Sequence, residues 1–251
     1  MGDLFDEGGS NEKPVHRVCL DGYFLGKHEV TQEQWLFVMK TDPAAFGSSR
    51  SRPVEQTSWV EVRQFIRKLN GISGKRYRLP TEAEWEFACR ERGKKVRFGN
   101  GRNLATVDEI NFDPHHSYPF SEKSGLYRGE TVPVGSFRPN ALGLYDMSGN
   151  VYELVADMYR YNAYEKHALR NPLFEDAARK EQVLHSDRAK STDDTAFDLK
   201  KYLAPTLYYA IRGGSWDRYA ERSRCTTRSR IHYGQRHFGV GFRLASSAEV
   251  P

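Results

Sequence analysis

The first part of the chain places apolar residues three and four positions apart, the spacing that brings side chains onto one face of a helix. The clearest stripe begins after Ser58 and consists of Val62, Phe65, Ile66 and Leu69. Thr31, Ser58 and Thr81 each stand three residues before a Gln or Glu, a pattern that caps the first turn of a helix. The pattern predicts three short helices whose apolar faces contribute to the core.

From Arg97 onward the pattern changes. Gly, Pro and Asn recur often, and the remaining apolar residues stand in short runs that turn residues separate. This arrangement is typical of short strands joined by irregular segments. The chain is therefore expected to be an α+β protein with two or three helices, short strands and much irregular structure.

A charged stretch interrupts this pattern between about residues 160 and 205. It lacks strong periodicity and contains the pairs Lys180-Glu181 and Asp193-Asp194. We interpret it as a partly helical insertion on the surface of the domain, and a functional lid is the alternative interpretation.

Composition limits the class of protein. The chain has 251 residues, of which 38% are hydrophobic and 28% charged, enough to bury a core as a single domain over 1–251. The net charge of +5 does not by itself favour nucleic acid, because a modest basic excess commonly serves solubility. No apolar run approaches the ~20 residues that span a bilayer, so the chain as given is expected to be soluble.

Few residues form a catalytic pattern. The sequence contains no His-Glu-x-x-His motif, no Gly-x-Ser-x-Gly turn and no Walker-type phosphate loop. Cys19, Cys89 and Cys225 are odd in number and widely spaced, so they are expected to be reduced, mostly structural thiols. His115 and His116 point apart on an extended chain, which favours a solvated loop over a metal-ligand pair.

Five sequence blocks stand in a recognisable order, at residues 29–31, 77–85, 143–153, 212–216 and 241–243. Together they resemble the formylglycine-generating enzyme, or sulfatase-modifying factor, domain family over nearly the whole chain. The resemblance implies a variant of the C-type-lectin-like fold. It also implies that a leading strand could be missing before Met1, because Met1 to Asp3 matches the middle of a family motif. The family includes oxidases, other enzymes and binding proteins, so the fold is better specified than the function.

The oxidases of this family bind copper(I) through two cysteines that follow the Gly-Gly-Ser turn. On this sequence those positions fall at about Arg218 and Ser223, and neither side chain is a soft ligand. The resemblance therefore implies a non-catalytic protein without copper. An enzyme or enzyme-maturation factor of the same family, or a scaffold fragment of a longer chain, are the alternatives.

Calcium is the cofactor that the resemblance suggests. Asn150 and Glu153 offer hard oxygen ligands in a Gly-led turn, where the carbonyl groups of Gly149 and Val151 can face the same ion. The equivalent segment of the resembling enzymes binds calcium. The alternative is that Asn150 adopts a strained turn while Glu153 pairs with an arginine.

A second family calcium site maps to Asn111 and Phe112, with partners around Gly125 and Tyr127. Glycine replaces the acidic ligand of the family at this place. The expectation of a second ion is therefore weaker, because calcium sites depend on charged oxygen ligands.

Residues 217–238 are rich in arginine, tyrosine and histidine, which offer large contact area and directional hydrogen-bond donors. The segment resembles the variable region of diversity-generating retroelement proteins, which share this fold and end in a similar Gly-Phe-Arg-Leu-Ala. Adenine-directed mutation of Asn-type codons reaches every residue of the segment except Glu221 and Gln235. An undiversified relative could carry the same residues.

We therefore predict a ligand-binding module, with a protein or cell-surface ligand and a hypervariable surface. The residues expected to contact the ligand are Asp217, Arg218, Tyr219, Arg222, Ser223, Arg224, Thr226, Ile231, His232, Tyr233, Arg236 and His237. The sequence names neither the ligand nor the compartment, and a missing N-terminal segment would allow export or surface display.

Overall fold

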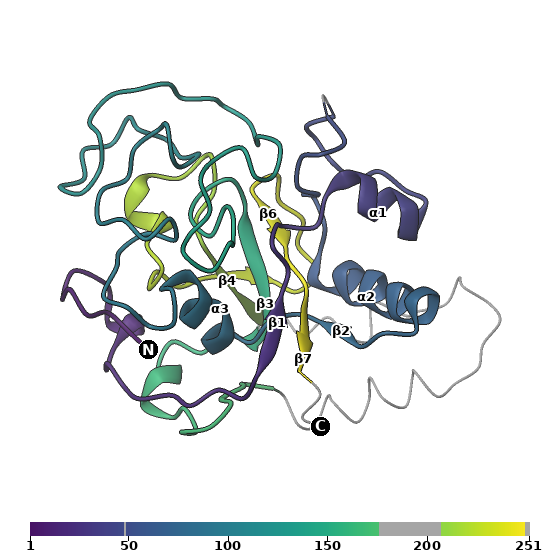
Figure 1. Ribbon diagram of the computed structural model, residues 1–251, viewed down its shortest axis with the longest axis horizontal. Helices are drawn as coiled ribbons and strands as arrows, with labels where there is room; N and C mark the ends of the chain where they lie inside the picture. The colour runs from purple at the N-terminus through teal and green to yellow at the C-terminus, as the bar shows by residue number, and fades with distance from the viewer. Residues whose placement is uncertain (48, 176–206, 249–251) are drawn as a thin grey trace.

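The computed structural model describes residues 1–47, 49–175 and 207–248. The helices are α1 (Gln32–Met39), α2 (Trp59–Ser73) and α3 (Glu82–Cys89), with 3-10 turns at η1 (Ser10–Glu12), η2 (Ala163–Glu165) and η4 (Ala220–Ser223). The strands are β1 (Tyr23–Leu25), β2 (Tyr77–Arg78), β3 (Tyr152–Met158), β4 (Tyr208–Arg212), β5 (Ser229–His232), β6 (Val240–Phe242) and β7 (Ala245–Ser247). Long irregular connections join these short elements (Figure 1).

The helices begin where the capping pairs predict them. The hydroxyl oxygens of Thr31, Ser58 and Thr81 each accept a hydrogen bond from the backbone N–H three residues later. Gly74 caps the C-terminal end of α2, and its φ of 68° lies in the left-handed region that glycine adopts without strain. The three helices predicted from apolar spacing are therefore confirmed.

Two small sheets form the centre of the fold, one with strand order β5-β4-β3-β6 and the other with order β1-β7-β2. In the larger sheet β3 is antiparallel to β4 and parallel to β6. Glu153 on β3 consequently lies opposite Arg212 on one side and Gly241 on the other. The sheet thus joins three of the sequence blocks that are far apart in the chain.

Helices pack against this frame from different sides (Figure 1). Trp35 of α1 and Phe65 of α2 stack with ring centroids 5.3 Å apart, and both rings meet Phe242 of β6 edge-on. α3 packs instead against β3 and β4. The long connection between α3 and β3 has its own apolar cluster, which includes Phe98 and Phe112.

Cys89 at the end of α3 and Cys225 after η4 form a buried disulfide, with Cα atoms 5.7 Å apart. The expectation that all three cysteines are reduced is therefore wrong for this pair, whereas Cys19 is a free cysteine. The two bonded residues are 136 positions apart in the sequence. Their contact is a product of the tertiary fold and leaves no local sequence signal.

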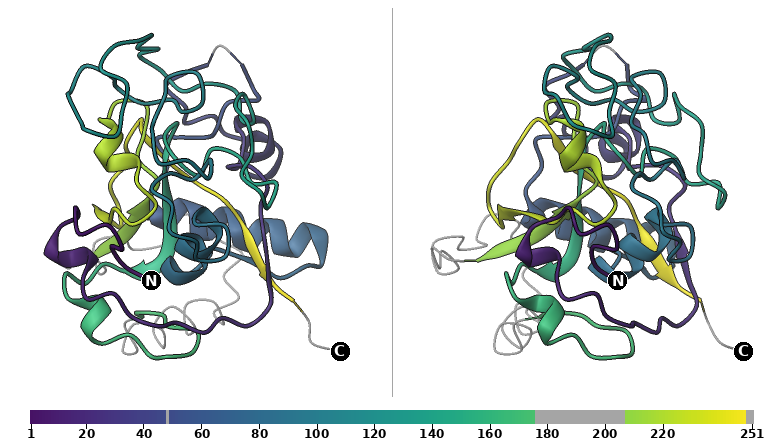
Figure 2. Two further views of the ribbon diagram at one scale, coloured as in Figure 1. Left: turned by 60° about the vertical axis from the view of Figure 1, so that its left-hand side comes forward. Right: turned by 90° about the vertical axis from the view of Figure 1, so that its left-hand side faces the viewer.

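Residues 160–175, the described part of the predicted insertion, lie beside the N-terminal segment (Figure 2). Cys19 donates its N–H to Leu169 and accepts a hydrogen bond from the N–H of Asn171. The remainder of the predicted insertion, and with it the lid interpretation, lies outside the described residues. No helix in the described residues is both long enough and apolar enough to cross a membrane.

Candidate binding surface

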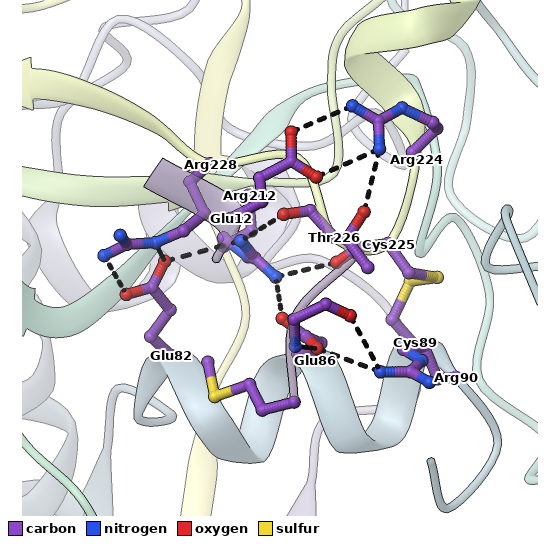
Figure 3. A network of polar contacts seen from close by, with 12 residues as sticks. Glu12, Glu82, Glu86, Cys89, Arg90, Arg212, Arg224, Cys225, Thr226 and Arg228 are labelled. Atoms are coloured by element: carbon purple, nitrogen blue, oxygen red, sulfur yellow. Dashed lines mark hydrogen bonds and ion pairs between the residues drawn. A yellow bond between two sulfur atoms is a disulfide. The ribbon is translucent and has the colours of Figure 1, made fainter. Parts of the chain in front are cut away.

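A buried ion-pair network ties the C-terminal segment to α3 (Figure 3). Arg212 of β4 donates to Glu86 Oε2 and to the carbonyl oxygen of Cys225, both at 2.7 Å. Arg228 donates to the two carboxylate oxygens of Glu82 at 2.7 and 2.8 Å. The four charged side chains are at most 1% exposed.

The arginines keep the carboxylates of this network ionised. Burial alone would raise the pKa of Glu86, but Arg212 and Arg90 outweigh burial and lower the pKa to about 2. Burial likewise opposes ionisation of Glu82, and Arg228 holds its pKa below the usual value. Removal of one partner would leave an uncompensated buried charge, so the network holds the backbone at this position.

Arg224 ties the same stretch of chain to the N-terminal segment. Its Nη1 and Nη2 donate to the two carboxylate oxygens of Glu12 at 3.0 and 2.9 Å, and Nη1 also donates to Thr226 Oγ1 at 2.9 Å. The disulfide between Cys89 and Cys225 adds a covalent link to α3. Ion pairs and disulfide together fix the backbone that follows η4 (Figure 3).

The chain just before this fixed backbone presents three large side chains to solvent, two ahead of η4 and one within it. The side chains of Arg218 and Arg222 are 48% and 57% exposed, and Tyr219 is 40% exposed. Arg218 Nε lies 3.6 Å from Asp217 Oδ2 and Arg222 Nε lies 3.7 Å from Glu221 Oε1. Both distances exceed a direct hydrogen bond, so the guanidinium groups have donors to offer a ligand.

The structure corrects five of the predicted contact residues, because they are buried. They are Ser223, Arg224, Thr226, Ile231 and Tyr233. Arg224 and Thr226 belong to the contacts beneath η4, and Ile231 and Tyr233 pack in apolar clusters. A buried side chain supports the surface from below and does not contact a ligand on it.

The other predicted contact residues are Asp217, His232, Arg236 and His237, and each is at least partly exposed. Arg236 forms an ion pair with Glu61 of α2, so its charge is already engaged. Burial lowers the pKa of His237, which favours the neutral imidazole near neutral pH. A role for these four residues in binding stays a prediction.

A loop outside the predicted segment lies against η4. The backbone N–H of Asp113 donates to the carbonyl oxygen of Arg218 at 2.9 Å, and the ring of His116 stacks on Tyr219 with centroids 4.6 Å apart. Sequence reasoning placed His115 and His116 in a solvated loop and did not connect them with the C-terminal segment. No local signal could do so, because the contact joins distant parts of the chain.

The side chains predicted to bind calcium have other partners. Arg243 donates to both carboxylate oxygens of Glu153 at 2.6 Å, and Trp85 Nε1 donates to the same carboxylate at 2.7 Å. Asn150 has a φ of 62°, and its side-chain oxygen accepts the N–H of Val132 at 2.9 Å. The arrangement matches the alternative interpretation, so these two side chains do not fit as calcium ligands.

Sequence reasoning missed two acidic side chains beside this turn. Glu29 Oε1 accepts a hydrogen bond from Asn150 Nδ2 at 3.1 Å, and Asp146 Oδ2 accepts the N–H of Gly135 at 2.7 Å. The other oxygens, Glu29 Oε2 and Asp146 Oδ1, are buried and accept no hydrogen bond from an N–H group of the described residues, and the two carboxyl groups hydrogen-bond each other. Burial raises the pKa of both groups, and Asp146 raises that of Glu29 further.

The second predicted calcium site stays a prediction. Asn111 donates its side-chain N–H to the carbonyl oxygen of Glu130 at 2.9 Å, while its side-chain oxygen is buried without a hydrogen-bond donor among the described residues. The ring of Phe112 is part of the apolar cluster. Across the residues that the structure describes, no three His, Cys, Asp or Glu side chains are placed to hold a metal ion.

The protein has an α+β fold with short strands and buried Arg–Glu pairs. Comparison with known proteins identifies the family to which it belongs. The chain belongs to the family of sulfatase-modifying factor enzyme 1-like domains, whose model matches residues 1–248. It is 28% identical to the serine/threonine-protein kinase Pkn1 of Chlamydia trachomatis over 97% of its own length, and spans 36% of that protein. It is 26% identical to the formylglycine-generating enzyme of Streptomyces coelicolor, over 100% of this chain and 87% of the relative.

Among solved structures, Treponema denticola variable protein 1 is similar to the chain with a TM-score of 0.70 and 23% sequence identity. The match covers 98% of this chain and 91% of the other. The predicted C-type-lectin-like fold of the formylglycine-generating type and the predicted family are thereby confirmed. The likeness to variable proteins is confirmed at the level of the fold.

Proposed function

We propose that this protein is a non-catalytic binding module whose exposed C-terminal surface binds a protein ligand. The observation that carries the proposal is the joint exposure of Arg218, Tyr219 and Arg222 around η4, above a backbone fixed by buried ion pairs and a disulfide. Arginine and tyrosine are enriched at binding hot spots. A backbone that is already ordered also loses less conformational entropy on binding.

The residues around η4 favour a binding function over the copper-dependent oxidase function of the family. The positions that the resemblance assigns to copper ligands hold the exposed guanidinium of Arg218 and the buried hydroxyl of Ser223. Cys225, close to them in the sequence, is bonded to Cys89 and therefore has no thiolate to give to a soft metal ion.

The rival function is an oxidase of the same family, and oxygen uptake distinguishes the two. The chain is incubated with copper(I) and a cysteine-containing peptide, with the same mixture lacking the chain as control. We expect no uptake above the control. Robust turnover would establish the oxidase and refute the binding module.

Selection from a random library tests the binding proposal directly. Disulfide-constrained peptides displayed on phage are panned against the folded chain, and enriched peptides are measured against the variant Arg218→Ala/Tyr219→Ala/Arg222→Ala. We expect affinity to fall at least about tenfold in this variant. The matched control, Arg76→Ala/Tyr161→Ala, removes an exposed arginine and tyrosine elsewhere and should bind as the wild type does. Equal binding by all three proteins would refute the proposal.

We also propose that calcium binds between Glu29 and Asp146, whose carboxyl groups take the place of the predicted Asn150 and Glu153 side chains. The two buried carboxyl groups are hard oxygen ligands, and a calcium ion would replace the proton that they share in their hydrogen bond. The carbonyl groups of Gly149 and Val151 remain predicted ligands of the same ion. A bound calcium ion would neutralise the carboxylates of Glu29 and Asp146. It would also hold the turn that precedes β3 against that strand.

We infer from the Cys89–Cys225 disulfide that the protein matures in an oxidising compartment, because disulfides form and persist there. Such a location agrees with a module that meets ligands outside the cell. Labelling of free thiols in protein taken directly from its source would test this proposal. One reactive thiol per chain, that of Cys19, is expected, and three would refute it.

A further inference from the structure

We propose that residues 113–127 form a second, fixed half of the binding surface, and that the complete surface recognises a protein loop carrying a carboxylate beside an aromatic or aliphatic side chain. The inference rests on the proposed binding function and specifies the partner of the same site. Four observations support it, namely ring contacts, a backbone link, exposed arginines and sheltered carboxylates.

Aromatic contacts connect the two halves. The ring of Trp216 lies at the centre, with centroid distances of 5.3 Å to Phe46, 5.5 Å to Phe238 and 6.1 Å to Tyr127. Tyr127 in turn meets His115 edge-on at 5.3 Å. Rings from three distant parts of the sequence therefore form one continuous set.

The loop is also joined to η4 itself. Asp113 and Tyr219 form a β-bridge, and the N–H of Asp113 donates to the carbonyl oxygen of Arg218 at 2.9 Å. His116 stacks on Tyr219 with an interplanar angle of 24°. A ligand that covers Tyr219 therefore meets the His116 ring as well.

The exposed charges indicate what the partner carries. Arg218 and Arg222 direct planar guanidinium donors at solvent, and such groups bind carboxylates through paired hydrogen bonds. The surrounding rings offer apolar contact at low entropic cost. A partner that satisfies both has an acidic side chain next to an aromatic or aliphatic one.

Two carboxylates within the surface argue against a nucleic acid partner. Asp113 and Asp217 stand among the rings with side chains 17% and 14% exposed, and they would repel a phosphate backbone. Against a protein loop the same carboxylates can accept hydrogen bonds from backbone N–H groups. The surface therefore fits a peptide chain better than a polyphosphate.

Single substitutions in the fixed half test the inference. A peptide selected on the wild-type chain is measured against His116→Ala, Tyr127→Ala and Tyr219→Ala. We expect each variant to weaken binding at least about tenfold, as hot-spot truncations do. Tyr161→Ala is the matched control, since this exposed tyrosine bonds Ser10 in the N-terminal segment, outside the ring set and the predicted contact residues. Tyr127→Phe retains the ring and should retain binding, which keeps the test valid if Tyr127→Ala fails to fold.

The outcomes separate the two proposals. Loss of binding in Tyr219→Ala with full binding in His116→Ala and Tyr127→Ala would overturn the fixed half and leave the proposed function standing. If no substitution at 217–238 changes the affinity for the selected peptide, the proposed function itself is refuted.

The partner chemistry has its own test, a second selection on the variant Arg218→Glu/Arg222→Glu. Wild-type selections should enrich Asp or Glu beside aromatic or aliphatic residues, and the reversed variant should enrich Lys or Arg instead. Wild-type selections without acidic enrichment would overturn the assigned partner chemistry.

Discussion

At the scale of single residues, burial decides what each arginine of the C-terminal segment does. Arg218 and Arg228 are ten positions apart in the same arginine-rich stretch, yet one is exposed and the other is paired with Glu82 in the interior. A single sequence gives both the same letter, so it could not separate contact residues from supporting ones. The same limit applies to the other buried positions, Ser223, Thr226, Ile231 and Tyr233, because the sequence does not show which side chains of the segment face inward.

Glu86 is the residue whose removal tests the buried network. Glu86→Gln removes the carboxylate that pairs with Arg90 and the nearer of the two that pair with Arg212, so we expect the free energy of unfolding at pH 7 to fall by about 3 kcal/mol in urea titrations. The exposed control Glu33→Gln should change it little.

The pH dependence of the same variant supplies a second readout. The pKa of Glu86 is lowered from 4.5 to about 2, so its contribution to stability is present above pH 4.5 and is lost as pH falls toward 2. The difference between wild type and Glu86→Gln should therefore narrow over that interval. A difference that stays constant would contradict the assigned ion pair.

At the scale of elements, local patterns predicted what local forces produce. Capping pairs and apolar stripes specified the helices, because hydrogen bonds and side-chain neighbours within a few residues determine where a helix starts. The disulfide and the contact of residues 113–127 with η4 depend on chain segments that meet only after folding. The sequence therefore predicted the helices and the family blocks, but not these contacts.

The disulfide should contribute strongly to the stability of η4 and α3. It closes a long loop, so Cys89→Ser/Cys225→Ser is expected to lower the free energy of unfolding by about 2–5 kcal/mol. Denaturant titration of both proteins, with Cys19→Ser as control, measures the loss. If the denaturant midpoint of Cys89→Ser/Cys225→Ser equals that of the wild type, the ion pairs alone hold η4 against α3.

The calcium proposal belongs to the turn that leads into β3. Chelation with EDTA should lower the melting temperature of the wild type, and added calcium should restore it, because bound ligand stabilises the folded state. Glu29→Gln/Asp146→Asn removes the two charges and should make the melting temperature insensitive to EDTA. If EDTA leaves the wild type unchanged, a proton and not a calcium ion compensates the two carboxylates.

At the scale of the whole molecule, the chain separates into a buried scaffold and a displayed surface. Three of the family blocks meet at the central sheet, where Glu153 pairs with Arg243, and Arg212 of the sheet pairs with Glu86 of α3. These contacts lie inside and explain why the fold could be predicted from the sequence blocks. The displayed surface could be predicted only in part, because it combines residues of 217–238 with a distant loop.

The sequence predicts a hypervariable surface on a constant scaffold, and sequencing the encoding locus across many cells tests this prediction most directly. We predict substitutions at template adenines in the codons of exposed positions, such as 218, 219 and 222, beside a reverse-transcriptase gene. Codons 212, 224, 225 and 228 should stay constant, because their side chains are buried in ion pairs or the disulfide. Invariant codons throughout 217–238, or substitutions spread equally over buried positions, would contradict the account.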